Sequence, residues 1–142
     1  MDETASKAFF LEDVKKLENI SSELGIYNPR TLGEKQVLFK FRWKNKTYAV
    51  LIKGGSDYPL SPTSIRFVNP ENTSDDSVAN WPVGVNAINS AERFVCILGS
   101  LEGHKRHPEW QQRQEKNRIP DLAFRFIGLF GEIEGYEEQS QT

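Results

Sequence analysis

The sequence predicts a single α+β domain in which an antiparallel sheet is packed on one face by helices. Three observations predict this class: an amphipathic segment near the start, runs of alternating apolar and polar residues after it, and a second amphipathic segment near the end. The chain has 142 residues, enough to bury a core of its own. We expect residues 1–142 to form one domain and the tail, residues 136–142, to be flexible.

The opening helix is predicted from Lys7 onward. Apolar residues recur there at the spacing of one helix face, and charged residues occupy the other face. Gly25 can adopt the left-handed conformation that ends a helix, and Asn28-Pro29 prevents the helix from resuming. The apolar positions are Phe10, Val14, Leu17 and Leu24.

The sheet is predicted from three runs of alternating residues. Gln36–Trp43 and residues 48–53 flank the turn-forming residues 44–46, so these two runs form a hairpin. A turn with two prolines follows at residues 58–62, where proline cannot donate hydrogen bonds to a strand. The alternation then returns over Ser64–Val68, which we expect to be a third strand.

The second half of the chain has a less regular pattern. Residues 69–80 contain almost no apolar side chain, so we expect a long solvated loop. Pro120 suits the first turn of a final helix, because its missing N–H has no intrahelical partner there. The apolar side of this helix would carry Leu122, Phe126, Leu129, Phe130 and Ile133.

The composition excludes several classes of function. With 18 Lys and Arg against 20 Asp and Glu, the chain has no positive field that would attract nucleic acid. Its longest apolar runs are far shorter than the roughly 20 residues that span a bilayer, so we expect no membrane partner. The amino terminus is acidic and lacks the features of a secretion signal, and one cysteine cannot form an internal disulfide. We therefore expect a cytoplasmic protein.

The only cysteine and the only two histidines of the chain lie within residues 93–110. Cys96 stands between two aliphatic residues, and His104 and His107 follow in a polar stretch. Thiolate and imidazole serve nucleophilic catalysis, and both are also zinc ligands. Only the two histidines have the short paired spacing of zinc ligands, and a second cysteine is missing, so we expect no metal and no cofactor.

The order of the elements and two local motifs together resemble the ubiquitin-conjugating enzyme (UBC-like) fold. That family opens with an amphipathic helix, continues with an antiparallel meander, and has a Tyr-Pro-x-x-Pro-Pro-like turn at its third strand. Residues 58–68, "YPLSPTSIRFV", match this turn, with Thr63 where the family has its second adjacent proline. Residues 94–101, "FVCILGSL", resemble the family's cysteine with its following aliphatic residues. The likeness covers most of the chain.

The resemblance implies that Cys96 carries a ubiquitin-like protein as a thioester. A conjugating enzyme accepts the carboxyl terminus of that protein from an activating enzyme and passes it to an amine on a target protein. A free thiol with a pKa of about 8.5 is only about 3% thiolate at pH 7, yet sulfur is nucleophilic enough for thioester exchange. The implied partners are therefore a ubiquitin-like protein, an activating enzyme and a protein target.

The chain departs from the eukaryotic members of that family. Their His-Pro-Asn tripeptide, whose asparagine stabilises the oxyanion or positions a loop, is absent, and Asn86 or Asn89 would have to substitute for it. The short helical end and a histidine after the cysteine are similar to bacterial conjugating enzymes of ubiquitin-like modification operons, some of which act in antiphage defence. His104 is the first candidate for the base that receives the amine proton, followed by His107.

Other interpretations of the same residues stay open. Cysteine is among the most buried residue types, so Cys96 can belong to the core. A surface or capping role for His104 fits its polar context equally well, and for His107 we favour capping or stacking on Trp110. The alternative function is a catalytically inactive UBC-like scaffold that binds a ubiquitin-like protein or an activating enzyme. A cysteine hydrolase is a weaker alternative, because no third orienting residue is evident.

Overall fold

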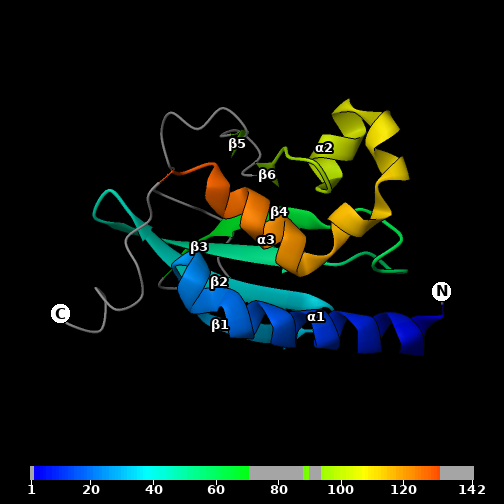
Figure 1. Cartoon of the computed structure of the whole chain (residues 1–142), viewed down its shortest axis with the longest axis horizontal. Coiled ribbons are helices and arrows are strands. Elements are labelled where there is room, and N and C mark those ends of the chain that lie inside the picture. The colour runs from blue at the N-terminus through cyan, green and yellow to red at the C-terminus, as the bar shows by residue number, and fades with distance from the viewer. Residues whose placement is uncertain (1, 71–87, 90–93, 132–142) are drawn as a thin grey trace.

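The computed structural model describes residues 2–70, 88–89 and 94–131 (Figure 1). Over these residues the chain is α+β, as predicted, with an antiparallel sheet and helices at both ends of the sequence. Helices α1 (Glu3–Leu24) and α3 (Ile119–Gly128) share one hydrophobic core with the sheet face that they cover. No helix in this part of the chain is long and apolar enough to cross a membrane.

Helix α1 begins before the predicted Lys7 because Asp2 caps it. The Asp2 carboxylate accepts a hydrogen bond of 2.7 Å from the backbone N–H of Ala5, which satisfies one of the free donors of the first turn. The predicted end is confirmed, since Gly25 has a left-handed backbone with a φ of 80°. The side of α1 that faces the sheet buries Phe10, Val14 and Leu17.

The sheet has the strand order β1-β2-β3-β4-β6-β5 among the described residues, and every neighbouring pair is antiparallel. The predicted hairpin and third strand are confirmed as three of these strands. Lys44 and Asn45, with φ of 50° and 66°, form the tight turn between β2 and β3, as expected for two residues at positive φ. The strands are β1 (Ile26–Gly33), β2 (Gln36–Trp43), β3 (Lys46–Lys53), β4 (Ser64–Val68), β5 (Ile88–Asn89) and β6 (Phe94–Val95).

Strand β1 was not predicted, and its irregular backbone is the reason. The register with β2 shifts between Tyr27 and Arg30, so that Asn28 and Pro29 form a bulge, and Asn28 has a φ of 54°. The dipeptide that interrupts the alternation in the sequence therefore lies inside a strand. This strand forms one edge of the sheet in the described structure.

The two faces of the sheet carry apolar clusters of different size. Alternate side chains of β2 to β4 point toward α1 and α3, and aromatic rings meet there; Phe41 contacts Phe126 edge to face, with ring centroids 5.6 Å apart. The other face carries a smaller buried apolar cluster that consists of Leu38, Ala49, Leu51 and Val68.

The final helix is confirmed but shorter than predicted. It ends at Gly128, so Leu129 and Phe130 pack on the core after the helix rather than within it, and Ile133 lies outside the described residues. Before it come helix α2 (Leu101–Arg106) and two 3-10 helices, η1 (Pro108–Gln112) and η2 (Gln114–Asn117), none of which was predicted. Most of the predicted 69–80 loop and the whole 136–142 tail lie outside the described residues.

A buried polar network joins the proline turn to both long helices. The hydroxyl of Tyr58 donates to the Asp13 carboxylate of α1 and accepts from the backbone N–H of Ile119 at the start of α3. Arg118 adds two hydrogen bonds to Asp13 through Nε and Nη2, at 3.1 and 2.6 Å. Burial, followed by the hydrogen bond to Asp13, raises the pKa of Tyr58 far above its ordinary value. The hydroxyl is therefore neutral at any ordinary pH.

Candidate functional site

Cys96 lies where the chain leaves the sheet. It directly follows β6, whose Phe94 pairs with Arg66 of β4 on one side and with Asn89 of β5 on the other. Cys96 is a free thiol and is partly exposed, whereas Val95 before it is fully buried. The residue thus lies at the surface end of a strand, and the interpretation that it is sealed in the core is not supported.

Ser100 closes the turn that follows Cys96. Its Oγ accepts hydrogen bonds of 3.0 Å from the backbone N–H groups of Ile97 and Gly103, and it donates one of 2.8 Å to the carbonyl of Ile97. The bond to Gly103 is a helix N-cap, which satisfies a free donor in the first turn of α2. One buried hydroxyl therefore ends the turn and begins the helix.

Thr63 attaches the cysteine segment to the proline turn. The N–H of Leu101 donates to the Thr63 carbonyl at 3.0 Å, and the N–H of Thr63 donates to the Gly99 carbonyl at 3.4 Å, which makes an isolated parallel bridge to Ser100. The Thr63 hydroxyl also donates to the carbonyl of Asn117 at 2.9 Å. A proline at position 63 would lack both donors. These contacts account for threonine where the resembled family has proline.

Arg125 of α3 holds the same turn from another side. Its Nε donates a hydrogen bond of 3.0 Å to the carbonyl of Leu98, and its Nη2 donates to the carbonyl of Lys116. Between these contacts lies Gly99, with a φ of 94°; a Cβ added there would collide with the Lys116 carbonyl. Burial lowers the pKa of the Arg125 guanidinium, which stays charged because arginine ionises so far above neutral pH. The backbone after Cys96 is therefore held by a half-buried cation.

His104 is a buried member of α2, with 4% of its surface exposed. Its Nε2 lies 3.2 Å from Oδ1 of Asn117, and Nδ2 of Asn117 donates to the carbonyl of Pro59 at 3.0 Å. Since the Asn117 amide nitrogen is the donor to Pro59, its oxygen is the acceptor and Nε2 of His104 carries the proton. Nδ1 is buried without a hydrogen-bond partner. These contacts favour a structural role, joining α2 to the proline turn.

His107 lies exposed at the end of α2. Its ring stacks on Trp110, with centroids 4.5 Å apart and an angle of 25° between the planes. Nδ1 lies 3.5 Å from a carboxylate oxygen of Glu109, and the backbone N–H donates to the carbonyl of Gly103 at 2.8 Å. This is the capping and stacking role that the sequence favoured for this residue.

The structure brings the predicted site residues together only in part. Cys96 lies in the connection between β6 and α2, and His104 lies in α2, but within the described residues neither histidine forms a hydrogen bond with the thiol. Asn86 lies outside the described residues, and Asn89 is described only as a backbone partner in β5. A role for either asparagine at an oxyanion therefore stays a prediction.

Three residues that support the cysteine turn escaped the sequence analysis. Ser100 had a detectable signal, because a serine followed by a short polar helical stretch is a typical N-cap. Arg125 and Asn117 had none, since each acts on groups that are distant in the sequence. Within the described part of the chain, no three or more His, Cys, Asp and Glu residues gather into a group that would hold a metal ion.

The chemistry that this arrangement supports is that of a lone thiol on a fixed backbone. A thiol needs no paired base to exchange with a thioester, so the separate bonding of His104 is compatible with acyl transfer at Cys96. No protein-family model matches the chain, and no curated protein matches it in sequence.

Proposed function

We propose that this chain is a ubiquitin-conjugating-like enzyme that carries a ubiquitin-like protein as a thioester on Cys96 and transfers it to an amine of a target protein. The observation that carries the proposal is the free, partly exposed Cys96 at the end of the sheet. The turn that follows Cys96 is anchored by hydrogen bonds with Ser100, Thr63 and Arg125. An acyl carrier needs a thiol that is both reachable and held in place.

The architecture supports the same proposal. A helix, four antiparallel strands in sequence, a cysteine segment and a final helix follow each other in the order that the resembled family shows. The proline turn lies between β3 and β4, and Thr63 at its end is bonded to the cysteine segment. The two motifs behind the resemblance, residues 58–68 and 94–101, are therefore in contact, although 25 residues separate them in the sequence.

In the proposed loading step, the Cys96 thiolate attacks the carbonyl carbon of the activating enzyme's thioester. The tetrahedral intermediate expels the thiolate of the activating enzyme, and a new thioester forms on Cys96. Because one thioester replaces another, the exchange needs no cofactor within this chain.

The transfer step is harder, because the attacking lysine amine must first lose a proton. At pH 7 this costs about 4.6 kcal/mol for a pKa of about 10.4. Desolvation beside the thioester lowers a lysine pKa by up to about 3 units or more, which supplies most of that energy. We assign His104 to the support of α2, because its ring is buried against Asn117.

The resemblance to enzymes of bacterial modification operons also suggests the source, the location and the process of this enzyme. We propose a bacterial, cytoplasmic enzyme whose partners are a ubiquitin-like protein and an activating enzyme, with antiphage defence as the process. A catalytically inactive scaffold on the same fold is the alternative that the experiment has to separate.

The decisive experiment combines the protein with ATP, a ubiquitin-like protein and its activating enzyme, which we expect the genes next to this one to encode. We expect an adduct on gels that disappears when a reductant is added. Cys96→Ser should give an adduct that resists thiols or no adduct, while His107→Ala, a change at the exposed histidine, should still load. A complex without any adduct would support the scaffold, and full transfer by Cys96→Ala would refute the enzyme.

A further inference from the structure

The segment between α2 and α3 carries basic and aromatic side chains at regular intervals. Three backbone hydrogen bonds link residues three apart along it: Trp110 donates to His107 at 3.0 Å, Arg113 to Trp110 at 2.9 Å and Lys116 to Arg113 at 2.9 Å. This is the hydrogen bonding of a 3-10 helix, in which side chains three residues apart lie one above the other. The stacked rings of His107 and Trp110 follow this pattern. We call these four residues the basic row.

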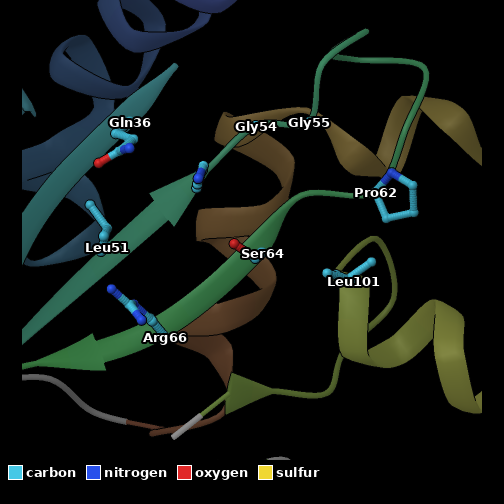
Figure 2. A pocket seen from close by; sticks show the side chains of 9 residues that line it. Gln36, Leu51, Gly54, Gly55, Pro62, Ser64, Arg66 and Leu101 are labelled. Atoms are coloured by element: carbon cyan, nitrogen blue, oxygen red, sulfur yellow. The ribbon is translucent and has the colours of Figure 1, made fainter. Parts of the chain in front are cut away.

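Both ends of the segment that carries the basic row are fixed near the cysteine turn. At its start, α2 begins beside the proline turn, where Figure 2 shows Leu101 close to Pro62 at a hollow of about 440 Å³. At its end, the carbonyl of Lys116 lies so close to Gly99 that a Cβ added to this glycine would collide with it. Lys116 therefore lies against the turn that follows Cys96.

The path from Lys116 to the thiol is short. Cys96 and Gly99 lie three residues apart, which is at most about 11 Å even in an extended chain. The hydrogen bond from the N–H of Ser100 to the carbonyl of Ile97 folds this turn more tightly. An extended peptide covers about 7 to 11 Å in two or three residues. A peptide whose carboxylate binds at Lys116 can therefore place a lysine two or three positions away at Cys96.

The two cations of the basic row have no carboxylate partner. In the part of the chain that the structure describes, the side chains of Arg113 and Lys116 make no hydrogen bond or ion pair. Arg113 is exposed, and Lys116 is half-buried, a state in which lysine packs its stem and keeps its charged end in water. Glu115 is exposed and lies outside the three-residue interval of the row. Both charges are therefore open to a carboxylate from a partner.

The charge of the row favours an acidic protein segment as its partner. A guanidinium binds a carboxylate through two parallel hydrogen bonds, and an ammonium adds a second point of attraction. The whole chain has a net charge of -2, so these cations form a local positive surface and not part of a general field for nucleic acid. The partly exposed Trp110 ring adds a flat apolar surface beside them.

We propose that the basic row docks the target of the transfer reaction and selects an acceptor lysine that has carboxylates two or three positions away. The inference rests on the proposed function and adds the substrate class to it. In the transfer, the lysine nitrogen bonds to the thioester carbonyl carbon, the carbon–sulfur bond breaks, Cys96 leaves as a thiolate, and the amine proton passes to water. Arg113 and Lys116 bind the target and take no part in these bonds.

The test compares two blocked seven-residue peptides as acceptors for the protein loaded on Cys96 with a ubiquitin-like protein. Both peptides have lysine at the centre and serine on each side of it, and the four outer positions are glutamate in one and glutamine in the other. We expect the glutamate peptide to discharge the thioester about fivefold faster, as two exposed ion pairs would give. Neighbouring carboxylates raise the pKa of the acceptor lysine and so slow its reaction, which means that the peptide alone would produce the opposite preference. Equal rates, or a faster glutamine peptide, would overturn the proposal.

Charge-removing variants locate the preference on the basic row. Arg113→Gln should reduce the ratio of the two rates about twofold, and Arg113→Gln with Lys116→Gln should abolish it. Neither change should alter the loading of Cys96 or its discharge to a single blocked lysine. The matched control, Arg30→Gln with Lys15→Gln, removes the same charge from exposed positions elsewhere and should keep the ratio. Loss of the ratio in the control as well would show a general charge effect and would overturn the assignment.

A binding measurement keeps this inference separate from the proposed function. Without an adduct on Cys96 the enzyme function fails, and the basic row is then judged by NMR titration of the unloaded chain with the same two peptides. The glutamate peptide should shift the backbone amide signals of Trp110, Arg113 and Lys116, and the glutamine peptide should leave them unshifted. Absent shifts, or the same shifts with an oligonucleotide of eight thymidines at a lower concentration, would overturn the assignment to an acidic protein segment. An adduct that both peptides discharge equally would leave the enzyme standing and remove the row.

Discussion

The hydroxyl of Tyr58 donates a hydrogen bond of 2.6 Å to the carboxylate of Asp13, which lies 45 residues earlier in the chain. Both side chains are fully buried, and the same hydroxyl accepts a hydrogen bond from the N–H of Ile119. The contact joins α1, the proline turn and the start of α3 at one point. It holds the two long helices in register with the turn that anchors the cysteine segment.

Replacing Tyr58 by phenylalanine should destabilise the fold by about 1 to 3 kcal/mol, because a buried carboxylate loses a donor and a buried N–H loses its acceptor. Urea unfolding measures this loss, provided that the slope of the unfolding free energy against urea concentration is the same in the variant and the wild type. Tyr48→Phe is the control, since Tyr48 is also a buried core residue but its hydroxyl makes no hydrogen bond within the described residues. If both variants lose the same stability, the network contributes nothing beyond ring packing.

Alkaline pH should weaken the wild-type protein through Tyr58. The pKa of this residue is raised in the folded state, mainly by burial, above the value of about 10 that it has when unfolded. Its contribution to stability is therefore complete below pH 10 and declines as the pH rises above that value, by about 1.4 kcal/mol at pH 11. The difference in unfolding free energy between wild type and Tyr58→Phe, measured from pH 8 to 11, should shrink accordingly. A constant difference would contradict this origin.

Gly99 and Gly128 should respond to alanine with opposite signs. Gly99→Ala places a Cβ against the Lys116 carbonyl at a φ of 94°, so we expect a loss of about 2 kcal/mol or more. Gly128→Ala adds a Cβ to open space in α3, where alanine is the better helix former, and should stabilise by up to about 1 kcal/mol. Thermal unfolding of both variants measures the two effects. A harmless Gly99→Ala would show that the turn adjusts freely.

Loss of the Arg125 side chain should expose Cys96. Arg125→Leu removes the donors to the carbonyls of Leu98 and Lys116, so the turn after the thiol opens more often and alkylation by iodoacetamide should accelerate about threefold or more. Mass spectrometry under native conditions measures the rate. Arg113→Leu, at an exposed position, is the control and should leave the rate unchanged. Equal rates in wild type and Arg125→Leu would show that this guanidinium does not restrain the turn.

Two substitutions of Thr63 should separate its two hydrogen bonds. Thr63→Val removes only the hydroxyl that donates to Asn117 and should cost about 1 kcal/mol. Thr63→Pro also removes the N–H that donates to Gly99, so we expect a further loss of about 1 to 2 kcal/mol although proline restores the pattern of the resembled family. Chemical denaturation of both variants provides the comparison. A proline variant as stable as the valine variant would contradict the bridge to the cysteine segment.

The predictable part of the fold is the part that local patterns control. Gln36–Trp43 and Ser64–Val68 were found with their observed bounds, because side chains alternate between a buried face and a second face along each strand. The end of α1 was found because glycine has a distinct conformational preference. Strand β1 was missed because the bulge at Asn28-Pro29 destroys the alternation that identifies a strand.

The candidate site was predictable only for residues whose chemistry is rare in the chain. Cys96 stood out as the only cysteine. The buried state of His104 could not be read from its polar neighbours, because it depends on Asn117 and Pro59, which other elements bring beside it. The hydrogen bonds from Arg125 to the cysteine turn depend in the same way on how α3 packs. Short elements such as α2 and β6 have weak local signals and are stabilised by tertiary contacts of this kind.

The bulge at Asn28-Pro29 also bears on how the protein behaves at high concentration. An outer strand with an unbroken row of free N–H and carbonyl groups invites another chain to add to the sheet, which is a common start of aggregation. On β1, Pro29 contributes no N–H and the bulge twists the backbone, so an incoming strand meets an interrupted template. The irregularity that hides this strand in the sequence therefore also guards it against unwanted self-association.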